Sequence, residues 1–243
     1  MTTFDHLLAV VLVLVLPALS AWDGPRLARR AAADPAHART RFYFGNIAIL
    51  WGLTAALVAG WWWDGRPARD LGLQLPGRAS GWWWTFLLCC AGLGFIVQQA
   101  YAFARSPVAQ ARVQKQFELQ PALQTVLPAT SEELRVYSAA AVTAGICEEV
   151  QYRGYLLWYF QSLVPGAAAI AAAILAFGVA HSYQGVRGIV ATGMAGALGM
   201  AVYLLTESLL APMLLHVTLD FVNGFTLYRV RARPAFTKAP PRR

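Results

Sequence analysis

The sequence predicts an all-α, polytopic membrane protein with about seven transmembrane helices around an intramembrane polar cavity. Of its 243 residues, 58% are hydrophobic and 13% are charged, and the mean hydropathy is +0.47. An average soluble protein carries roughly a quarter charged residues. The apolar residues form separate runs, most of them near the roughly 20 residues that span the hydrocarbon core. We therefore expect a single integral membrane domain over residues 1–243.

The net charge of +8 does not indicate a nucleic-acid-binding protein. The arginines cluster between and after the apolar runs and form no solvated basic domain, so the lipid bilayer is the expected partner and no nucleic acid is expected. The three cysteines predict no disulfide framework: Cys89 and Cys90 are neighbours in one apolar run, and Cys147 lies in another.

The first apolar run covers residues 4–22. No Lys or Arg precedes it and it contains Asp5, so a retained membrane helix is favoured over a cleaved signal peptide. We expect a polar connection over residues 22–41, rich in arginine, and then a second membrane helix over residues 42–63.

A Gly- and Pro-rich connection, residues 64–80, precedes the third run at residues 81–104. Three consecutive tryptophans stand at each side of this connection, as in the aromatic belt at a membrane interface. Residues 105–129 are the longest polar stretch, and we expect them to lie along the membrane surface.

The fourth helix is predicted to begin after Thr130, which forms a Thr-x-x-Glu capping box with Glu133. No helix breaker follows before residues 165–166, so this helix has about 30 residues and can cross the bilayer and protrude. The next run, residues 166–181, is too short to span. We expect it to end, with an irregular loop at 182–187, below the membrane surface, where such backbone lines a cavity.

The sixth run, residues 188–205, carries small residues at four-residue spacing, which lets helices pack closely in lipid. The seventh run is at residues 209–228, and an arginine-rich tail follows. Because positively charged loops stay inside, we expect a multi-pass protein of the cell inner membrane with its C-terminus in the cytoplasm.

The ionisable residues inside the apolar runs are the candidates for chemistry, because a charge at the centre of a membrane helix costs about 2.5 to 3.5 kcal/mol. Glu149 and Arg153 are four residues apart, so we expect them to pair. Glu148 then has no local partner. His181 ends the short fifth run, and His216 and Asp220 share one face of the last helix.

These residues are suited to activate a water molecule. A carboxylate beside imidazoles in a partly dry pocket can hold a water molecule, take its proton and direct the water oxygen at a carbonyl carbon. Zinc is the competing hypothesis, with Glu148, His181 and His216 as ligands, although no His-Glu-x-x-His helix is present. A Cys147 nucleophile is disfavoured because the charge of Glu148 opposes a thiolate.

Three motifs in order resemble those of the CPBP family of intramembrane endopeptidases, which includes the CAAX proteases and the Abi-type bacteriocin immunity proteins. Glu148 to Arg153 matches Glu-Glu-x-x-x-Arg, Phe177 to His181 matches Phe-x-x-x-His, and His216 to Asp220 matches His-x-x-x-Asn/Asp. The resemblance covers a core of about residues 134 to 228.

The resemblance implies that Glu148 activates water, that His181 helps to hold it, and that His216 and Asp220 orient groups and stabilise the oxyanion. Glu149, Arg153 and Phe177 would support the site or the substrate. Well-studied CAAX proteases have Asn where this chain has Asp220. An ionised Asp donates no hydrogen bond, so we expect Asp220 to orient His216 and Asn223 to supply a donor.

The expected function is therefore an intramembrane endopeptidase of glutamic type, without a cofactor, that acts on a membrane-associated protein or peptide. The alternative is a non-catalytic immunity or scaffold protein, or a transporter that uses the same buried charges.

Overall fold

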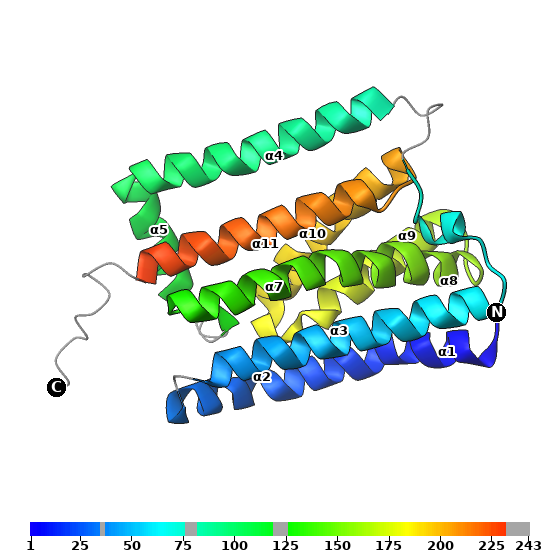
Figure 1. Ribbon diagram of the computed structural model, residues 1–243, viewed down its shortest axis with the longest axis horizontal. Helices are drawn as coiled ribbons and strands as arrows, with labels where there is room; N and C mark the ends of the chain where they lie inside the picture. The colour runs from blue at the N-terminus through cyan, green and yellow to red at the C-terminus, as the bar shows by residue number, and fades with distance from the viewer. Residues whose placement is uncertain (35–36, 76–81, 119–125, 232–243) are drawn as a thin grey trace.

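The computed structural model describes residues 1–34, 37–75, 82–118 and 126–231, and every regular element in these ranges is a helix. The long helices lie roughly along one direction and form a bundle (Figure 1). The elements of its first half are α1 (Thr3–Val10), the π-helical η1 (Val11–Val15), α2 (Leu16–Ala33), α3 (Ala38–Trp63), the short η2 (Ala68–Leu71), α4 (Trp82–Arg105) and α5 (Pro107–Glu118). Those of its second half are α7 (Ser131–Glu148), the π-helical η4 (Glu149–Leu156), α8 (Leu157–Gln161), α9 (Gly166–Ala180), η5 (Ser182–Gln184), α10 (Gly185–Thr206) and α11 (Leu210–Arg231).

The predicted all-α polytopic class is confirmed. Within the described ranges, four helical stretches are long and apolar enough to cross a membrane: Thr3–Ala33, Ala38–Trp63, Ser182–Thr206 and Leu210–Arg229. Gly166–Ala180 is a shorter apolar helix, as its length in the sequence predicted. The other two predicted runs are also helical: α4 lies beside α11, and the rod made of α7, η4 and α8 lies between α3 and α11 (Figure 1).

The expected polar connection at residues 22–41 is wrong in its first half, because the first helix continues to Ala33. Contacts hold this extension. Leu27 is buried, Arg26 donates to the carbonyl of Trp22 at 2.8 Å, and Gly24 lies close against Tyr183 of η5. Tertiary packing of this kind supports a helix in spite of unfavourable local residues. The irregular loop at 182–187 is also shorter than expected, because α10 begins at Gly185.

The central rod begins at the predicted capping box. The Thr130 hydroxyl accepts the backbone N–H of Glu133 at 3.1 Å, and the Glu133 carboxylate accepts the N–H of Thr130 at 3.2 Å. Beyond Glu148 the rod becomes π-helical, and all eight residues of η4 are buried. A π-helical stretch changes the direction of each following side chain, and such stretches are frequent at functional sites.

Two glycines bring α7 and α11 together. A Cβ on Gly145 would lie 2.8 Å from the backbone nitrogen of Val217, and a Cβ on Gly224 would overlap the ring of Tyr137. Such close contact between helices in lipid requires small residues. The first crossing places His216, the neighbour of Val217, beside the glutamates that end α7.

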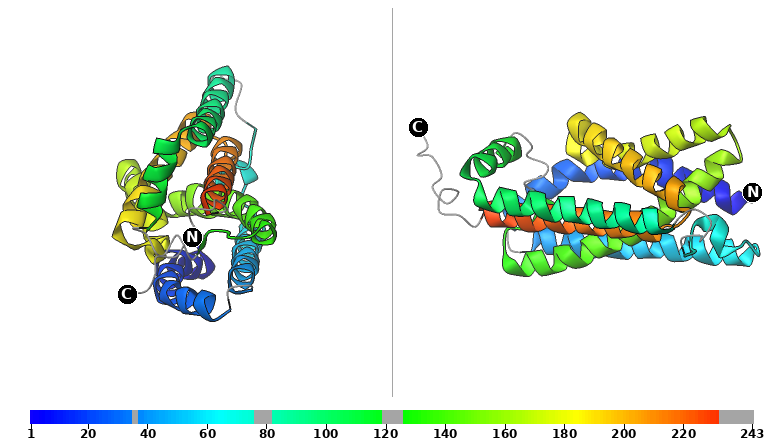
Figure 2. Two further views of the ribbon diagram at one scale, coloured as in Figure 1. Left: turned by 90° about the vertical axis from the view of Figure 1, so that its left-hand side faces the viewer. Right: turned by 90° about the horizontal axis from the view of Figure 1, so that it is seen from above.

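The N-terminal helix is fastened to the opposite end of the central rod. Arg66 donates to both carboxylate oxygens of Asp5, at 2.8 and 2.7 Å, and the Tyr155 hydroxyl donates to the Asp5 carbonyl at 2.6 Å. These contacts fix α1 against η4. Figure 2 shows α1, in dark blue, at the end of the bundle that carries the N-terminus.

Candidate active site

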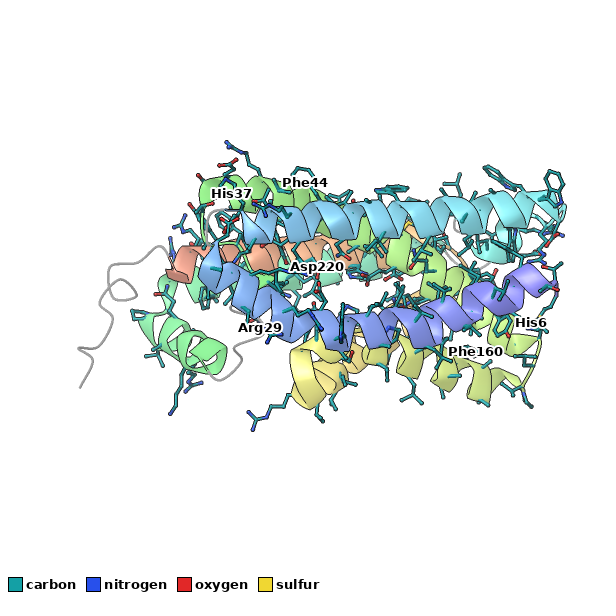
Figure 3. All side chains as sticks on the ribbon, turned by 90° about the horizontal axis from the view of Figure 1, so that it is seen from below. His6, Arg29, His37, Phe44, Phe160 and Asp220 are labelled. Carbon is teal, nitrogen blue, oxygen red and sulfur yellow. The ribbon has the colours of Figure 1, made fainter. Side chains whose placement is uncertain are left out.

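Three segments bring the predicted site residues together. The end of α7 and the start of η4 supply Glu148, Glu149 and Arg153, the end of α9 supplies His181, and α11 supplies His216 and Asp220. Seen from below the bundle, Asp220 lies between the ribbons of α2 and α3 (Figure 3). The side chains of Glu148, His181 and His216 are 13%, 17% and 15% exposed, so the site lies inside the helical bundle.

Glu148 faces both histidines. Its Oε2 atom lies 3.8 Å from Nε2 of His181 and 4.0 Å from Nε2 of His216. The same oxygen is buried and has no hydrogen-bond partner among the described residues. Both distances are too long for a direct hydrogen bond and are of the kind that a small polar molecule bridges.

The hydrogen bond of His181 sets its tautomer. Its Nδ1 atom lies 2.9 Å from the carbonyl oxygen of Phe177. A carbonyl only accepts, so Nδ1 carries a proton and Nε2 of the neutral ring presents its lone pair toward Glu148. The Phe177 ring also packs against the His181 ring, with centroids 5.0 Å apart, which restricts the orientation of the imidazole.

His216 is held by the second glutamate. Its Nδ1 atom lies 2.8 Å from Oε1 of Glu149, and its Nε2 points toward Glu148. Asp220, which we expected to orient this ring, lies 3.6 Å from its Nε2 atom, and the hydrogen bond to the ring comes from Glu149. One turn of α11 places Asp220 beside the site, and the crossing at Gly145 brings Glu149 to Nδ1.

The predicted pair of Glu149 and Arg153 is confirmed, with Nη1 of Arg153 3.0 Å from Oε1 of Glu149. Both side chains are nearly inaccessible, at 1% and 3% exposed. Arg153 also donates to the carbonyl of Gly196 at 3.2 Å and lies over the Phe177 ring, 4.1 Å from its centroid. The guanidinium thus joins η4, α9 and α10.

Sequence reasoning did not find the glycines that make room for this guanidinium. A Cβ on Gly199 would lie 3.0 Å from Nη2 of Arg153, and one on Gly196 would lie 2.7 Å from Cδ1 of Phe177. Their four-residue spacing relative to other small residues indicated close helix packing. In the structure these glycines form a recess for the ion pair of Glu149 and Arg153. The feature of the sequence that could have indicated such a recess was the arginine four residues after a glutamate.

Residues 130–222 match the family model of type II CAAX prenyl endopeptidases, Rce1-like. The similarity to this family extends over these residues, which we call the Rce1-like segment. The chain matches no curated protein and no solved structure. All six charged or imidazole-bearing site residues described above lie inside the Rce1-like segment, and so do the glycines that shape the recess.

Asn223, expected as a hydrogen-bond donor, is exposed on α11, one residue beyond the matched range. Within the described residues, no group of three or more His, Cys, Asp or Glu side chains is arranged to hold a metal ion, and the zinc alternative stays a hypothesis.

Proposed function

We propose that the protein is an intramembrane endopeptidase of glutamic type that hydrolyses a peptide bond near the membrane surface. One observation carries this proposal. The buried, unpartnered Oε2 of Glu148 faces the Nε2 atoms of two histidines at 3.8 and 4.0 Å. The match to a family of CAAX endopeptidases supports the same reaction class.

In the proposed reaction, a water molecule donates one hydrogen bond to Glu148 and the other to the Nε2 lone pair of His181. Its oxygen then points a lone pair at the carbonyl carbon of the substrate. Glu148 takes a proton as the carbon–oxygen bond forms, which is general-base catalysis. The same proton then passes to the leaving amine as the peptide bond breaks, and a carboxylic acid and an amine are released.

His216 would stabilise the oxyanion that forms on the substrate carbonyl. With both nitrogens protonated, the ring donates from Nε2 to the oxyanion and keeps its Nδ1 bond to Glu149. The pair of Glu149 and Arg153 positions this ring, and Asp220 lies near enough to influence its charge. Positioning of this kind counts because an oxyanion donor must be in place before the charge develops.

We propose a membrane-associated protein or peptide as the substrate, with no metal cofactor. Arginines in the polar segments and in the tail support a location in the inner membrane with the C-terminus in the cytoplasm. The bilayer limits the substrate to chains that reach the site at membrane depth.

The test compares membrane proteomes of three strains: the parent, one that lacks the protein, and one that carries Glu148→Gln at matched expression. We expect the second and third strains to accumulate the same uncleaved precursor. If the Glu148→Gln strain has the parent proteome while the deletion strain has a phenotype, the carboxylate is structural and the protein is a scaffold, an immunity protein or a transporter.

A further inference from the structure

A cavity of about 510 Å³ opens between α2 and α3, near the end of α2 and the start of α3. None of the residues of the candidate active site lines it. Its lining comes from two helices that precede the Rce1-like segment: Asp23, Leu27, Arg30, Ala33 and Asp34 on one side, and Ala38, Arg41, Phe42, Gly45, Asn46 and Ile49 on the other.

The α3 wall of the cavity lies at the depth of the active site. Tyr43 packs edge-on against Tyr137, and the Tyr137 hydroxyl donates to the backbone carbonyl of Asp220 at 3.2 Å. Two turns further along α3, the Leu50 carbonyl accepts the side-chain amide of Gln151 in η4 at 3.2 Å. The lining residues between these contacts therefore span the depth between Asp220 and η4.

The α2 wall touches the segment that follows His181. A Cβ on Gly24, which adjoins Asp23, would lie 3.1 Å from Cβ of Tyr183, and the Tyr183 ring lies 6.1 Å from the His181 ring. Tyr183 thus links the α2 wall of the cavity to His181 of the catalytic cluster.

The lining has the chemistry of a peptide-binding surface. Two ion pairs stand at its rim, between Arg30 and Asp23 at 3.3 Å and between Arg41 and Asp34 at 2.8 Å. Their guanidinium-bearing side chains are 63% and 73% exposed, and exposed pairs are weak enough to exchange partners readily. Apolar side chains and one amide complete the lining, from Leu27, Phe42, Ile49 and Asn46.

We propose that this α2–α3 cavity binds the polypeptide substrate on one side of the scissile bond and delivers it to Glu148. A peptide presents backbone donors and acceptors together with apolar side chains, and the cavity offers balanced charge with an apolar wall. The inference rests on the proposed function. A phospholipid headgroup is the competing occupant.

Two glycines of α3 provide a matched test. Gly45 lines the cavity, whereas Gly52 lies seven residues on, on the same helix face but outside the lining. Neither has any atom within 4 Å of the position of a Cβ, so a larger residue fits the backbone at both positions. Gly45→Trp fills the cavity, and Gly52→Trp makes the same change elsewhere.

Binding is measured without chemistry, in the Glu148→Gln background. The probe is a fluorescent peptide that spans the cleavage site of the precursor found in the Glu148→Gln strain. We expect Gly45→Trp to raise the dissociation constant of the peptide roughly tenfold or more, because the added ring occupies space that the peptide would fill. The affinity of Gly52→Trp for the peptide should equal that of the Glu148→Gln protein without a second substitution. Equal affinities of the two variants overturn the inference even if the parent protein cleaves the precursor.

A second measurement reports access to the cavity and not hydrolysis. Gly45→Cys and Gly52→Cys are treated in opened membranes with a water-soluble maleimide, and labelling is counted above that of the parent. We expect Gly45→Cys to be labelled and to be protected by the peptide, whereas Gly52→Cys stays unlabelled. If phospholipid suppresses the labelling and the peptide does not, the cavity is a headgroup site and the proposal is contradicted. If these results hold and no hydrolysis occurs, the binding cavity stands and the proposed reaction fails.

Discussion

Nδ1 of His216 lies 2.8 Å from Oε1 of Glu149, and the same oxygen lies 3.0 Å from Nη1 of Arg153. In the proposed reaction, the two adjacent glutamates therefore have different tasks. Glu149 is a buried structural anion that orients an imidazole, and Glu148 is free to face the reactive nitrogens of both histidines. This difference separates variants that unfold the protein from variants that only stop the reaction.

Glu149→Gln should destabilise the fold. It removes the counter-charge of the buried Arg153, and breaking a buried ion pair typically costs about 3 to 5 kcal/mol. Thermal unfolding of the detergent-solubilised protein, followed by tryptophan fluorescence, measures the effect. Glu148→Gln is the matched control and should unfold near the parent temperature. Indistinguishable unfolding of Glu149→Gln and the parent would show that the pair does not stabilise the protein.

Gly199→Ala should disturb the recess of Arg153, because the added Cβ would lie 3.0 Å from Nη2. Gly193→Ala on the same helix is the control, since nothing lies within 4 Å of its Cβ position. In a helix, alanine is otherwise favoured over glycine by about 1 kcal/mol. We expect Gly193→Ala to be neutral or stabilising and Gly199→Ala to lower both the unfolding temperature and the cleavage rate. The opposite order would mean that the guanidinium is not confined there.

His181→Ala should reduce hydrolysis by about 10²-fold or more, because the ring holds the water that Glu148 deprotonates and general-base catalysis depends on that position. The control is His6→Ala: His6 is exposed and bonded to Tyr159 at 2.8 Å, and it lies far along the bundle from Asp220 (Figure 3). Cleavage of the precursor by both purified variants is compared. A rate for His181→Ala within a fewfold of the His6→Ala rate would remove His181 from the mechanism.

Chelators should leave hydrolysis unchanged, because the proposed reaction uses only side chains of the chain. The purified protein is dialysed against 1,10-phenanthroline, and cleavage is measured before and after Zn²⁺ is added back. A loss of activity that Zn²⁺ restores would support the alternative in which Glu148, His181 and His216 bind the metal.

The parts of the site that depend on local spacing could be predicted from the sequence. The pair of Glu149 and Arg153 follows from a spacing of four residues, and the Thr130 capping box follows from its residue types. The hydrogen bond between Glu149 and His216 could not be predicted in the same way, because 67 residues separate them and the approach depends on the crossing at Gly145.

The helix from Leu16 to Ala33 shows a second limit of local reasoning. Its Gly, Pro and arginines favour a loop, but buried Leu27 and the contact of Gly24 with Tyr183 of η5 support a helix. The π-helical η4 likewise has no local signal, because its buried side chains have their partners on α1, α3, α9, α10 and α11. Tertiary contacts therefore decided the elements that the sequence did not predict.

The central claim is that Glu148 activates the water that cleaves the peptide bond. The most direct measurement is the cleavage rate of the purified precursor by the parent protein and by Glu148→Gln, both reconstituted in lipid nanodiscs at equal unfolding temperature. The account predicts a loss of about 10²-fold or more for Glu148→Gln with binding of the precursor retained. Cleavage by Glu148→Gln at the parent rate would contradict it.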